Sequence, residues 1–326
     1  MPRIRFSIII ATYNQRGLIK DAVDSALCQR NDAVEIIVVD DASTDGTQDV
    51  LRQYGDAIRL VCRETNGRVS VARNCGAVLA TGEYLVFLDG DDALVPWALD
   101  VYERIIQTTN PKMIVARLWQ FEGMLPVALP GNAPQSTQII EYVDYYRKDR
   151  TAASTASALV VDRQIFQSVG GWSPDMLLME DHDLAMKLGV SGRTILILAP
   201  PTAFYRNHAN NASKDIPGYL PWVCKVIRNE RLGKYPGGAQ RRFQRHALIG
   251  GYILTWASRG IKRGLYADTL KLIANNWPMA LAAVTRKLVV RLRGRKAPET
   301  LDMPGGQTPG GQRPWTREQG AAGEML

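Results

Sequence analysis

The residues best suited to chemistry in this chain are three aspartates, Asp89, Asp91 and Asp92, in the segment YLVFLDGDDALVP at 84–96. They follow an apolar run typical of a buried strand, where crowded carboxylates repel one another unless positive charge lies nearby. One aspartate would suffice to cap the helix expected beyond Pro96. Hard divalent cations take oxygen ligands, typically one or two carboxylates plus substrate phosphates. The D-x-D spacing therefore predicts a site for a metal together with a diphosphate.

Two further polar clusters follow predicted strands, ATYN at 11–14 and DDASTDGT at 40–47. Helix capping accounts for Ser43 to Thr47, because such side chains accept hydrogen bonds from the free amides at a helix start. It does not account for Asp40 and Asp41, which still belong to the strand. Ligands of open α/β sheets bind beyond the carboxyl ends of the strands, which is where all three clusters are predicted to lie.

Two later segments, MEDHDL at 179–184 and FYRNHANNAS at 204–213, leave alternatives open. Acidic residues suit the solvated first turn of a helix, since they favour the positive end of its dipole, and Asp183 and Glu180 are the candidates for that alternative. A lone histidine such as His208 is more often structural than a ligand. The chain has only three histidines, which excludes a histidine-rich metal site.

The elements that must position these residues alternate along the first 118 residues. Strands are predicted at 5–11, 34–40, 57–62 and 83–89, and helices at 17–29, 43–54, 70–81 and 97–107. A strand at 157–162, a helix at 179–192 and a strand at 194–199 follow a less regular stretch at 119–150. Short apolar runs separated by amphipathic helices predict an α/β fold, with a mostly parallel, Rossmann-like sheet flanked by helices on both faces.

The C-terminal part differs in charge. Residues 221–296 hold 17 Lys plus Arg against Glu230 and Asp268, a net of +15, while the remainder of the chain has a net charge of −7. Helices with basic and apolar faces are predicted at 241–263 and 267–296. This pattern is typical of a helix lying on anionic lipid, which we favour, while nucleic-acid binding is the alternative and no module signature supports it.

These changes of pattern predict three parts: 1–217, an α/β domain; 218–296, a basic helical extension; and 297–326, a disordered tail rich in Gly, Pro and Gln. Four scattered cysteines without framework spacing favour a reducing compartment. We find no signal-peptide pattern and no apolar run of the roughly 20 residues that a spanning helix needs. We therefore expect a cytoplasmic protein, with peripheral contact to the inner face of the plasma membrane.

The ordered set SIIIATYN, VVDDASTDGT, ARNCG, GEYLVFLDGDD, GGW and MEDHDL resembles family 2 glycosyltransferases of the GT-A fold, over about residues 4–213. The resemblance implies an inverting enzyme that moves a sugar from a nucleotide-diphosphate sugar, by default a UDP-sugar, to a hydroxyl of a glycan or a polyprenyl-linked acceptor. It also implies Mn²⁺ or Mg²⁺ as cofactor and a role in cell-surface polysaccharide biosynthesis.

The same resemblance implies roles for matching positions. The residues implied in nucleotide-sugar binding are Thr12, Tyr13, Asn14, Asp41, Ser43, Arg73, Asp89 and Arg206. Asp91 is the stronger metal ligand, with Asp89 and His208 beside it. Asp181 matches the catalytic base that deprotonates the acceptor hydroxyl, and Glu180 assists in acceptor contact.

The sequence departs from the family pattern in two places. The usual N-x-G is shifted, so that Arg68 stands where a glycine is expected; a positive φ there would strain the turn. The Q-x-x-R-W motif of processive synthases is not found after MEDHDL, which favours transfer of one or a few sugars.

Three other functions are less well supported. A sugar nucleotidyltransferase would carry a Gly-rich, basic phosphate loop after the first strand, and ATYNQRG is not one. A dehydrogenase would show G-x-G-x-x-G at the same place. A catalytically inactive, nucleotide-sugar-binding scaffold stays open, although intact Asp41, Asp89, Asp91 and Asp181 argue against it.

Overall fold

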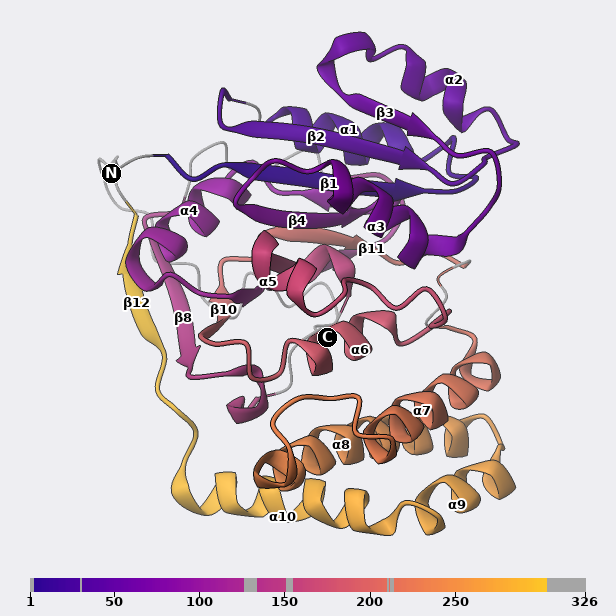
Figure 1. Cartoon of the computed structure of the whole chain (residues 1–326), viewed down its shortest axis with the longest axis vertical. Coiled ribbons are helices and arrows are strands. Elements are labelled where there is room, and N and C mark those ends of the chain that lie inside the picture. The colour runs from indigo at the N-terminus through magenta and orange to yellow at the C-terminus, as the bar shows by residue number, and fades with distance from the viewer. Residues whose placement is uncertain are drawn as a thin grey trace.

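A nine-stranded sheet organises the computed structural model, which describes residues 3–29, 31–125, 134–150, 155–209, 211 and 214–303 (Figure 1). Its order is β12-β8-β10-β6-β9-β4-β1-β2-β3. The strands are β1 (Phe6–Thr12), β2 (Val34–Asp40), β3 (Arg59–Cys62), β4 (Tyr84–Asp89), β6 (Met113–Val115), β8 (Ser136–Tyr142), β9 (Leu159–Asp162), β10 (Thr194–Ala199) and β12 (Glu299–Asp302). A smaller sheet, of order β5-β11-β7, contains β5 (Ala93–Leu94), β7 (Leu118–Phe121) and β11 (Ala203–Arg206).

The α/β class is confirmed, but the large sheet is mixed. Strands β3, β2, β1 and β4 are parallel, as are β6 and β10. β9 lies antiparallel between β4 and β6, and β8 and β12 add two further antiparallel pairs. Sequence periodicity indicates that a segment is a strand but does not indicate its direction. The expectation of a mostly parallel sheet therefore holds for β3, β2, β1 and β4 and for the β6–β10 pair, and not for the other neighbours.

Helices cover both faces of this sheet, and further helices follow toward the C-terminus. The described helices are α1 (Ile19–Leu27), α2 (Thr47–Arg52), α3 (Arg68–Leu79), α4 (Ala98–Thr109), α5 (Arg163–Ser168), α6 (Glu180–Lys187), α7 (Ile216–Arg231), α8 (Arg242–Lys262), α9 (Tyr266–Ala274) and α10 (Trp277–Arg293). Alternate strand residues point to opposite faces. Ile8 and Ile10 pack in a core with α1 and α4, whereas Ile9 packs in a second core with α3, α5 and α6.

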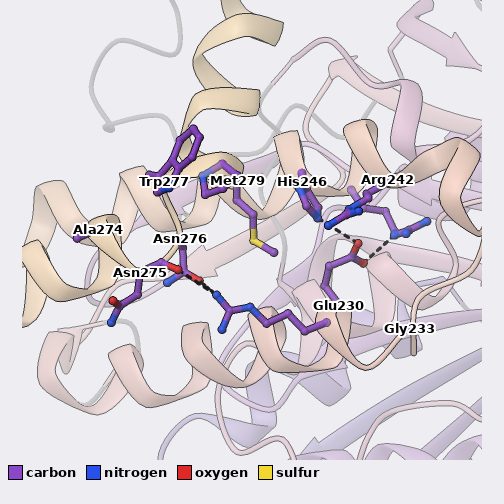
Figure 2. Close-up of a pocket in the computed structure, with 12 residues that line it drawn as sticks. Glu230, Gly233, Arg242, His246, Ala274, Asn275, Asn276, Trp277 and Met279 are labelled. Atoms are coloured by element: carbon purple, nitrogen blue, oxygen red, sulfur yellow. Dashed lines mark hydrogen bonds and ion pairs between the residues drawn. The ribbon is translucent and has the colours of Figure 1, made fainter.

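The last four helices gather at one side of the molecule, next to α6 (Figure 1). The single helix expected at 267–296 is two helices, α9 and α10, separated at Asn275 and Asn276. α8 and α10 cross closely at Gly250, where an added Cβ would lie 1.9 Å from the carbonyl oxygen of Met279. Between the α7–α8 pair and the α9–α10 junction lies a cavity that contains Glu230 and several basic residues (Figure 2).

The predicted tail is ordered at its start. After α10 the chain returns to the sheet, where β12 pairs antiparallel with β8 at the edge. Residues 304–326 lie outside the described residues, and the limits of the three predicted parts stay a prediction. Across the described ranges, no helix is both long enough and apolar enough to cross a bilayer.

Candidate active site

A cavity of about 440 Å³ opens at the carboxyl ends of β1 and β4, beside the first turns of α3 and α6. The predicted site residues that line it are Thr12, Tyr13, Asp41, Arg73, Asp89, Asp91, Glu180 and Asp181. Four others, Asn14, Ser43, Arg206 and His208, are not among its lining residues. Segments about 170 residues apart in sequence therefore meet in one hollow, as the topological rule for open α/β sheets requires.

Asn14 and Ser43 join the loop after β1 to the loop after β2, at the edge of this cavity. The backbone N–H of Asn14 donates to Ser43 Oγ at 2.8 Å, and the N–H of Thr44 donates to Asn14 Oδ1 at 2.8 Å. Asn14 adopts a φ of +51°, which asparagine tolerates better than most residues. The result is that Tyr13, which remains 47% exposed, is presented at the cavity edge.

The two aspartates at the end of β2 have different surroundings. Asp40 accepts hydrogen bonds from the Ser43 N–H at 3.0 Å and from Gln48 Nε2 at 2.7 Å, so it organises its own loop. Asp41 is buried, lines the cavity and accepts from the Gly67 N–H at 3.1 Å as well as from Arg63. Arg63 was missed in the sequence, although its place directly after β3 is the same strand-end signal.

The position where the family pattern has glycine meets the condition under which strain was expected. Arg68 starts α3 with a φ of +71°, in the left-handed region that favours glycine. Its side chain lines the cavity, so a strained backbone places a cation there.

Arg73 is the electrostatic centre of the site. Its Nη2 donates to Asp89 Oδ1 at 2.5 Å and its Nη1 to Glu180 Oε1 at 3.0 Å, and the guanidinium lies 4.6 Å from the centre of the Trp172 ring. Burial alone lowers its pKa, but the charges of Asp89 and Glu180 outweigh burial and raise it above the ordinary value. Arg73 thus links the end of β4 to the start of α6.

The DGDD turn contains two more carboxylates whose surroundings disfavour their charge. Burial, together with Asp91 and Asp89, raises the pKa of Asp92 well above its ordinary value. Asp92 accepts from Ser157 Oγ at 2.6 Å and from the Arg206 N–H at 2.9 Å, so it braces the turn and caps no helix. Burial and the neighbouring Asp89 likewise raise the pKa of Asp91, whose Oδ2 lies 2.8 Å from His208 Nε2.

Arg206 points away from the cavity. Its Nε donates to the Asp91 carbonyl at 2.9 Å, and its Nη atoms donate to the Gly123 carbonyl and to Asp21. It also lies 4.6 Å from the centre of the Phe121 ring. In this arrangement Arg206 holds the turn that carries Asp91, and its predicted contact with the diphosphate stays a prediction.

The first turn of α6 carries the acidic pair. Burial and the adjacent Asp181 raise the pKa of Glu180 to about 7, against the lowering effect of Arg73. Asp181 Oδ1 accepts from the backbone N–H of His182 at 2.6 Å and lies 2.6 Å from its Nδ1. Asp183 is buried rather than solvated, with Ser173 Oγ at 2.6 Å and Tyr235 Oη at 2.7 Å.

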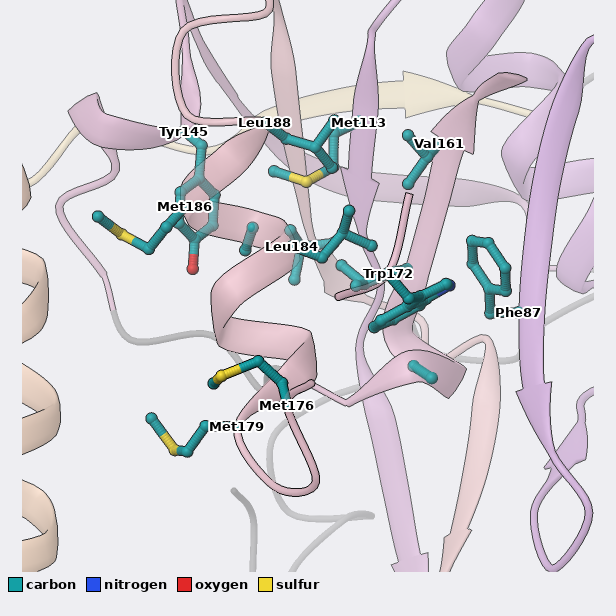
Figure 3. Packing of buried hydrophobic residues seen from close by; sticks show 14 of the residues in the cluster. Phe87, Met113, Tyr145, Val161, Trp172, Met176, Met179, Leu184, Met186 and Leu188 are labelled. Atoms are coloured by element: carbon teal, nitrogen blue, oxygen red, sulfur yellow. The ribbon is translucent and has the colours of Figure 1, made fainter. Parts of the chain in front are cut away.

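Hydrophobic packing fixes this helix against the sheet. Figure 3 shows Leu184 between Met176 and Leu188, in a cluster that extends to Trp172 and Phe87. The Trp172 ring, which contacts Arg73 on one side, meets Phe87 of β4 edge-on with centroids 5.0 Å apart. Trp172 of the GGW segment therefore packs between Arg73 and the sheet and supports Arg73 in the site.

Two aromatic residues of the C-terminal helices also reach the site. Tyr219 of α7 lines the cavity and stacks on Trp256 of α8 with ring centroids 4.0 Å apart. Tyr252 of α8 meets the His182 ring edge-on at 4.4 Å. No sequence signal predicted these contacts, because the two aromatic residues lie in a segment whose charge indicated a membrane or nucleic-acid partner.

The side chains available as metal ligands fit a hard cation only in part. Within the described ranges no group of three His, Cys, Asp or Glu side chains is arranged to hold a metal ion. Asp91 and Asp89 do supply partly buried carboxylate oxygens whose mutual repulsion a cation would relieve. Cations such as Mg²⁺ are commonly held by one or two carboxylates plus substrate phosphates, so a site completed by a diphosphate is compatible with these residues.

A sequence model described as "Glycosyl transferase family 2" matches residues 7–159. The Escherichia coli protein "UDP-Glc:alpha-D-GlcNAc-diphosphoundecaprenol beta-1,3-glucosyltransferase WfaP" is 44% identical over 214 residues, which cover 64% of this chain and 80% of that protein. The glycosyltransferase TuaG of Bacillus subtilis, named for teichuronic acid biosynthesis, is 42% identical over 104 residues, 31% of this chain and only 40% of its own length.

Solved structures share the fold at low identity. S. aureus TarS 1–349 in complex with UDP-GlcNAc aligns with a TM-score of 0.62 at 15% identity, covering 85% of this chain and 81% of that one. The mannosyltransferase PcManGT from Pyrobaculum calidifontis, in complex with GDP-Man and Mn²⁺, aligns with a TM-score of 0.52 at 18% identity and 88% coverage of both. With the family match and the relatives above, these findings show that the chain belongs to glycosyltransferase family 2 and has the GT-A fold.

Proposed function

We propose that this protein is an inverting, metal-dependent enzyme that transfers a sugar from a UDP-sugar to a hydroxyl of a polyprenyl-diphosphate-linked glycan. The observation that carries this proposal is one cavity lined at once by Asp89, Asp91 and Asp181. The name of the 44% identical relative, a UDP-Glc and diphosphoundecaprenol enzyme, supports both donor and acceptor class. UDP-glucose is therefore the first donor to test.

The donor half of the cavity is proposed to lie over the ends of β1, β2 and β4. Tyr13, exposed at the edge, would flank the base, and the buried Asp41 would accept from the base or ribose. Asp91, with Asp89 and His208 beside it, would hold Mn²⁺ or Mg²⁺. When bound, such a cation neutralises charge on the departing diphosphate. The cationic Arg68 faces the same space and adds to that neutralisation.

Asp181 is proposed as the general base. Inverting transfer needs one carboxylate that takes the proton of the acceptor hydroxyl as it attacks the sugar from the side opposite the leaving group. Asp181 lines the cavity, and the contacts with His182 fix its Oδ1. Glu180, whose pKa of about 7 leaves it partly protonated near neutrality, is suited to hydrogen-bond an acceptor hydroxyl as well as Arg73.

Two linked measurements test the function. Thermal shifts with nucleotide diphosphates and their sugars, each with Mn²⁺, with Mg²⁺ and with chelator, identify a ligand that stabilises the folded state. Sugar transfer to a polyprenyl-diphosphate-linked acceptor is then assayed for the wild type and for Asp181→Asn, with Asp100→Asn on the exposed side of α4 as the charge-matched control.

We expect metal-dependent stabilisation by one nucleotide, transfer by the wild type and by Asp100→Asn, and loss of transfer by a factor of about 100 or more in Asp181→Asn. Donor-induced stabilisation should persist in Asp181→Asn. Nucleotide-sugar binding without sugar transfer in the wild type would instead favour the scaffold function. Near-normal transfer by Asp181→Asn would show that Asp181 is not the base.

A further inference from the structure

One face of α10 exposes a continuous apolar stripe. Trp277, Leu281, Val284, Leu288 and Leu292 follow one another at spacings of three or four residues, so they lie along one side of the helix. All five are more than half exposed, Leu292 most of all at 77%. A soluble helix usually turns such a stripe toward a core.

The opposite face of α10 is already buried. Met279 and Ala283 pack against α8 at the Gly250 crossing, and Arg286 donates to the backbone carbonyl of Tyr146 at 2.7 Å. The helix is therefore fixed on the protein by one side, and the stripe is held facing outward. Tyr266 and Leu270 of the preceding helix α9 are also exposed, at 62% and 68%.

Positive charge flanks this stripe. Lys287 and Arg291 lie one turn apart on α10, next to Val284 and Leu288 in helical projection, and both are exposed. Arg293, Arg295 and Lys296 follow at the end of the helix. Long basic side chains beside apolar ones are typical of helices that lie in a bilayer interface, where the alkyl stems contact apolar groups and the charged ends reach phosphates.

A basic cavity of about 520 Å³ lies at the start of the stripe. Arg231, Arg242 and Arg245 line it against one acid, Glu230, which Arg245 Nε contacts at 2.7 Å. Burial lowers the pKa of His246 below its ordinary value, with Glu230 acting to raise it and Arg242 and Arg245 to lower it further. Figure 2 shows Trp277 beside this cavity with its ring turned away from Glu230.

We propose that the stripe on α10, its flanking basic residues and this cavity together bind the surface of an anionic phospholipid bilayer, with the cavity receiving a lipid phosphate. Charge selects this occupant. Residues 221–296 have a net charge of +15, so a second copy of the same face would be repelled, whereas an anionic surface is attracted. Nucleic acid would satisfy the charge but leaves a row of five apolar side chains in water.

The same helices connect this surface to the active site. α8, which packs on α10, also brings Tyr252 against His182 and Trp256 against Tyr219. Binding through α10 would therefore fix the active-site cavity relative to the bilayer. The proposal stands apart from the proposed function, since vesicle binding is measured without donor or acceptor.

The test is co-sedimentation of the full chain with vesicles of equal parts phosphatidylglycerol and phosphatidylcholine, compared with phosphatidylcholine alone. We expect binding to the anionic vesicles that weakens as salt is raised. Lys287→Gln with Arg291→Gln should weaken it about 25-fold, from about fivefold for each charge near the surface. Leu281→Ser with Leu288→Ser should weaken it at least about tenfold, and Arg242→Gln about fivefold.

Control variants remove charge or apolar surface from other helices. Lys20→Gln with Arg52→Gln removes two exposed charges from α1 and α2, and Val78→Ser removes an exposed apolar side chain from α3. Both should bind vesicles as the wild type does, and every variant is checked for an unchanged melting temperature. The proposal would be overturned if the controls lost as much vesicle binding as the α10 variants, or if the wild type did not bind anionic vesicles. It would also be overturned if the protein bound DNA but not vesicles, and both α10 double variants still bound DNA.

Discussion

His182 Nδ1 lies 2.6 Å from Asp181 Oδ1, and Tyr252 packs edge-on against the same imidazole. The helical extension thus fixes the ring that orients the proposed base. His182→Phe keeps a ring against Tyr252 but loses the nitrogen contact. We expect kcat to fall about tenfold, since geometry of the base matters to proton transfer, with little change in the KM for the donor.

A comparison variant separates positioning from packing in this pair. His182→Asn retains a short side chain able to donate to Asp181, so it should recover part of the lost kcat while packing less well against Tyr252. The positioning role would be wrong if kcat fell as far in His182→Asn as in His182→Phe. It would also be wrong if both variants had a lower melting temperature and an unchanged kcat.

Glu180 makes stability depend on pH. Its pKa is about 7 in the folded state against an ordinary 4.5, so between these values the folded protein binds a proton that the unfolded chain has lost. Stability contributed by this group is present below about pH 4.5 and is lost as pH rises toward 7, by up to about 3 kcal/mol. Urea midpoints at pH 5 and pH 8 should therefore differ more for the wild type than for Glu180→Gln. Asp91 and Asp92 titrate in both proteins, so parallel pH profiles would contradict this expectation.

Asp91 should govern the response to metal. Asp91→Asn keeps the shape of the side chain but removes the charge that a divalent cation needs, and it relieves the repulsion with Asp89. We expect the apo variant to melt at or above the wild-type temperature, while stabilisation by UDP with Mn²⁺ falls to the level seen with chelator. His208→Gln should lose less of that stabilisation, because a carboxylate is the preferred ligand of such ions. Full metal-dependent stabilisation in Asp91→Asn would place the cation elsewhere.

Much of the site was predictable because strand ends and sequence motifs are local signals. Such signals identified Thr12, Arg73, Asp89, Glu180 and Asp181 among the residues that line the cavity from β1, β4, α3 and α6. The lining residues Ala11, Val69 and Ala72 were not named, and the family was recognised from the order of the motifs. The strain at Arg68 was inferred only on the condition of a positive φ, which the structure supplies. These inferences depend on a few neighbouring residues each.

What escaped prediction depends on contacts between distant segments. The contacts of Arg206 with Asp21, 185 residues away in sequence, and with the Gly123 carbonyl could not be predicted from local patterns. Tyr219 and Tyr252 reach the site only because α7 and α8 fold back onto α6. The direction of β9 and the pairing of β12 with β8 are likewise decided by chain connections and edge contacts, which apolar periodicity does not record.

The α8–α10 crossing offers a matched pair of glycines. Gly250→Ala would place a Cβ 1.9 Å from the Met279 carbonyl, so the helices must separate, whereas Gly251, its neighbour in the same helix, has open space around an added Cβ. We expect Gly250→Ala to lower the free energy of unfolding by about 1–3 kcal/mol, as overpacking does. Gly251→Ala should raise the free energy of unfolding by up to about 1 kcal/mol, because alanine is more stable than glycine in a helix interior.

Because α8 also carries Tyr252, Gly250→Ala should lower kcat as well as the melting temperature, and Gly251→Ala should leave kcat unchanged. Equal effects of the two substitutions would show that α8 and α10 do not cross this closely.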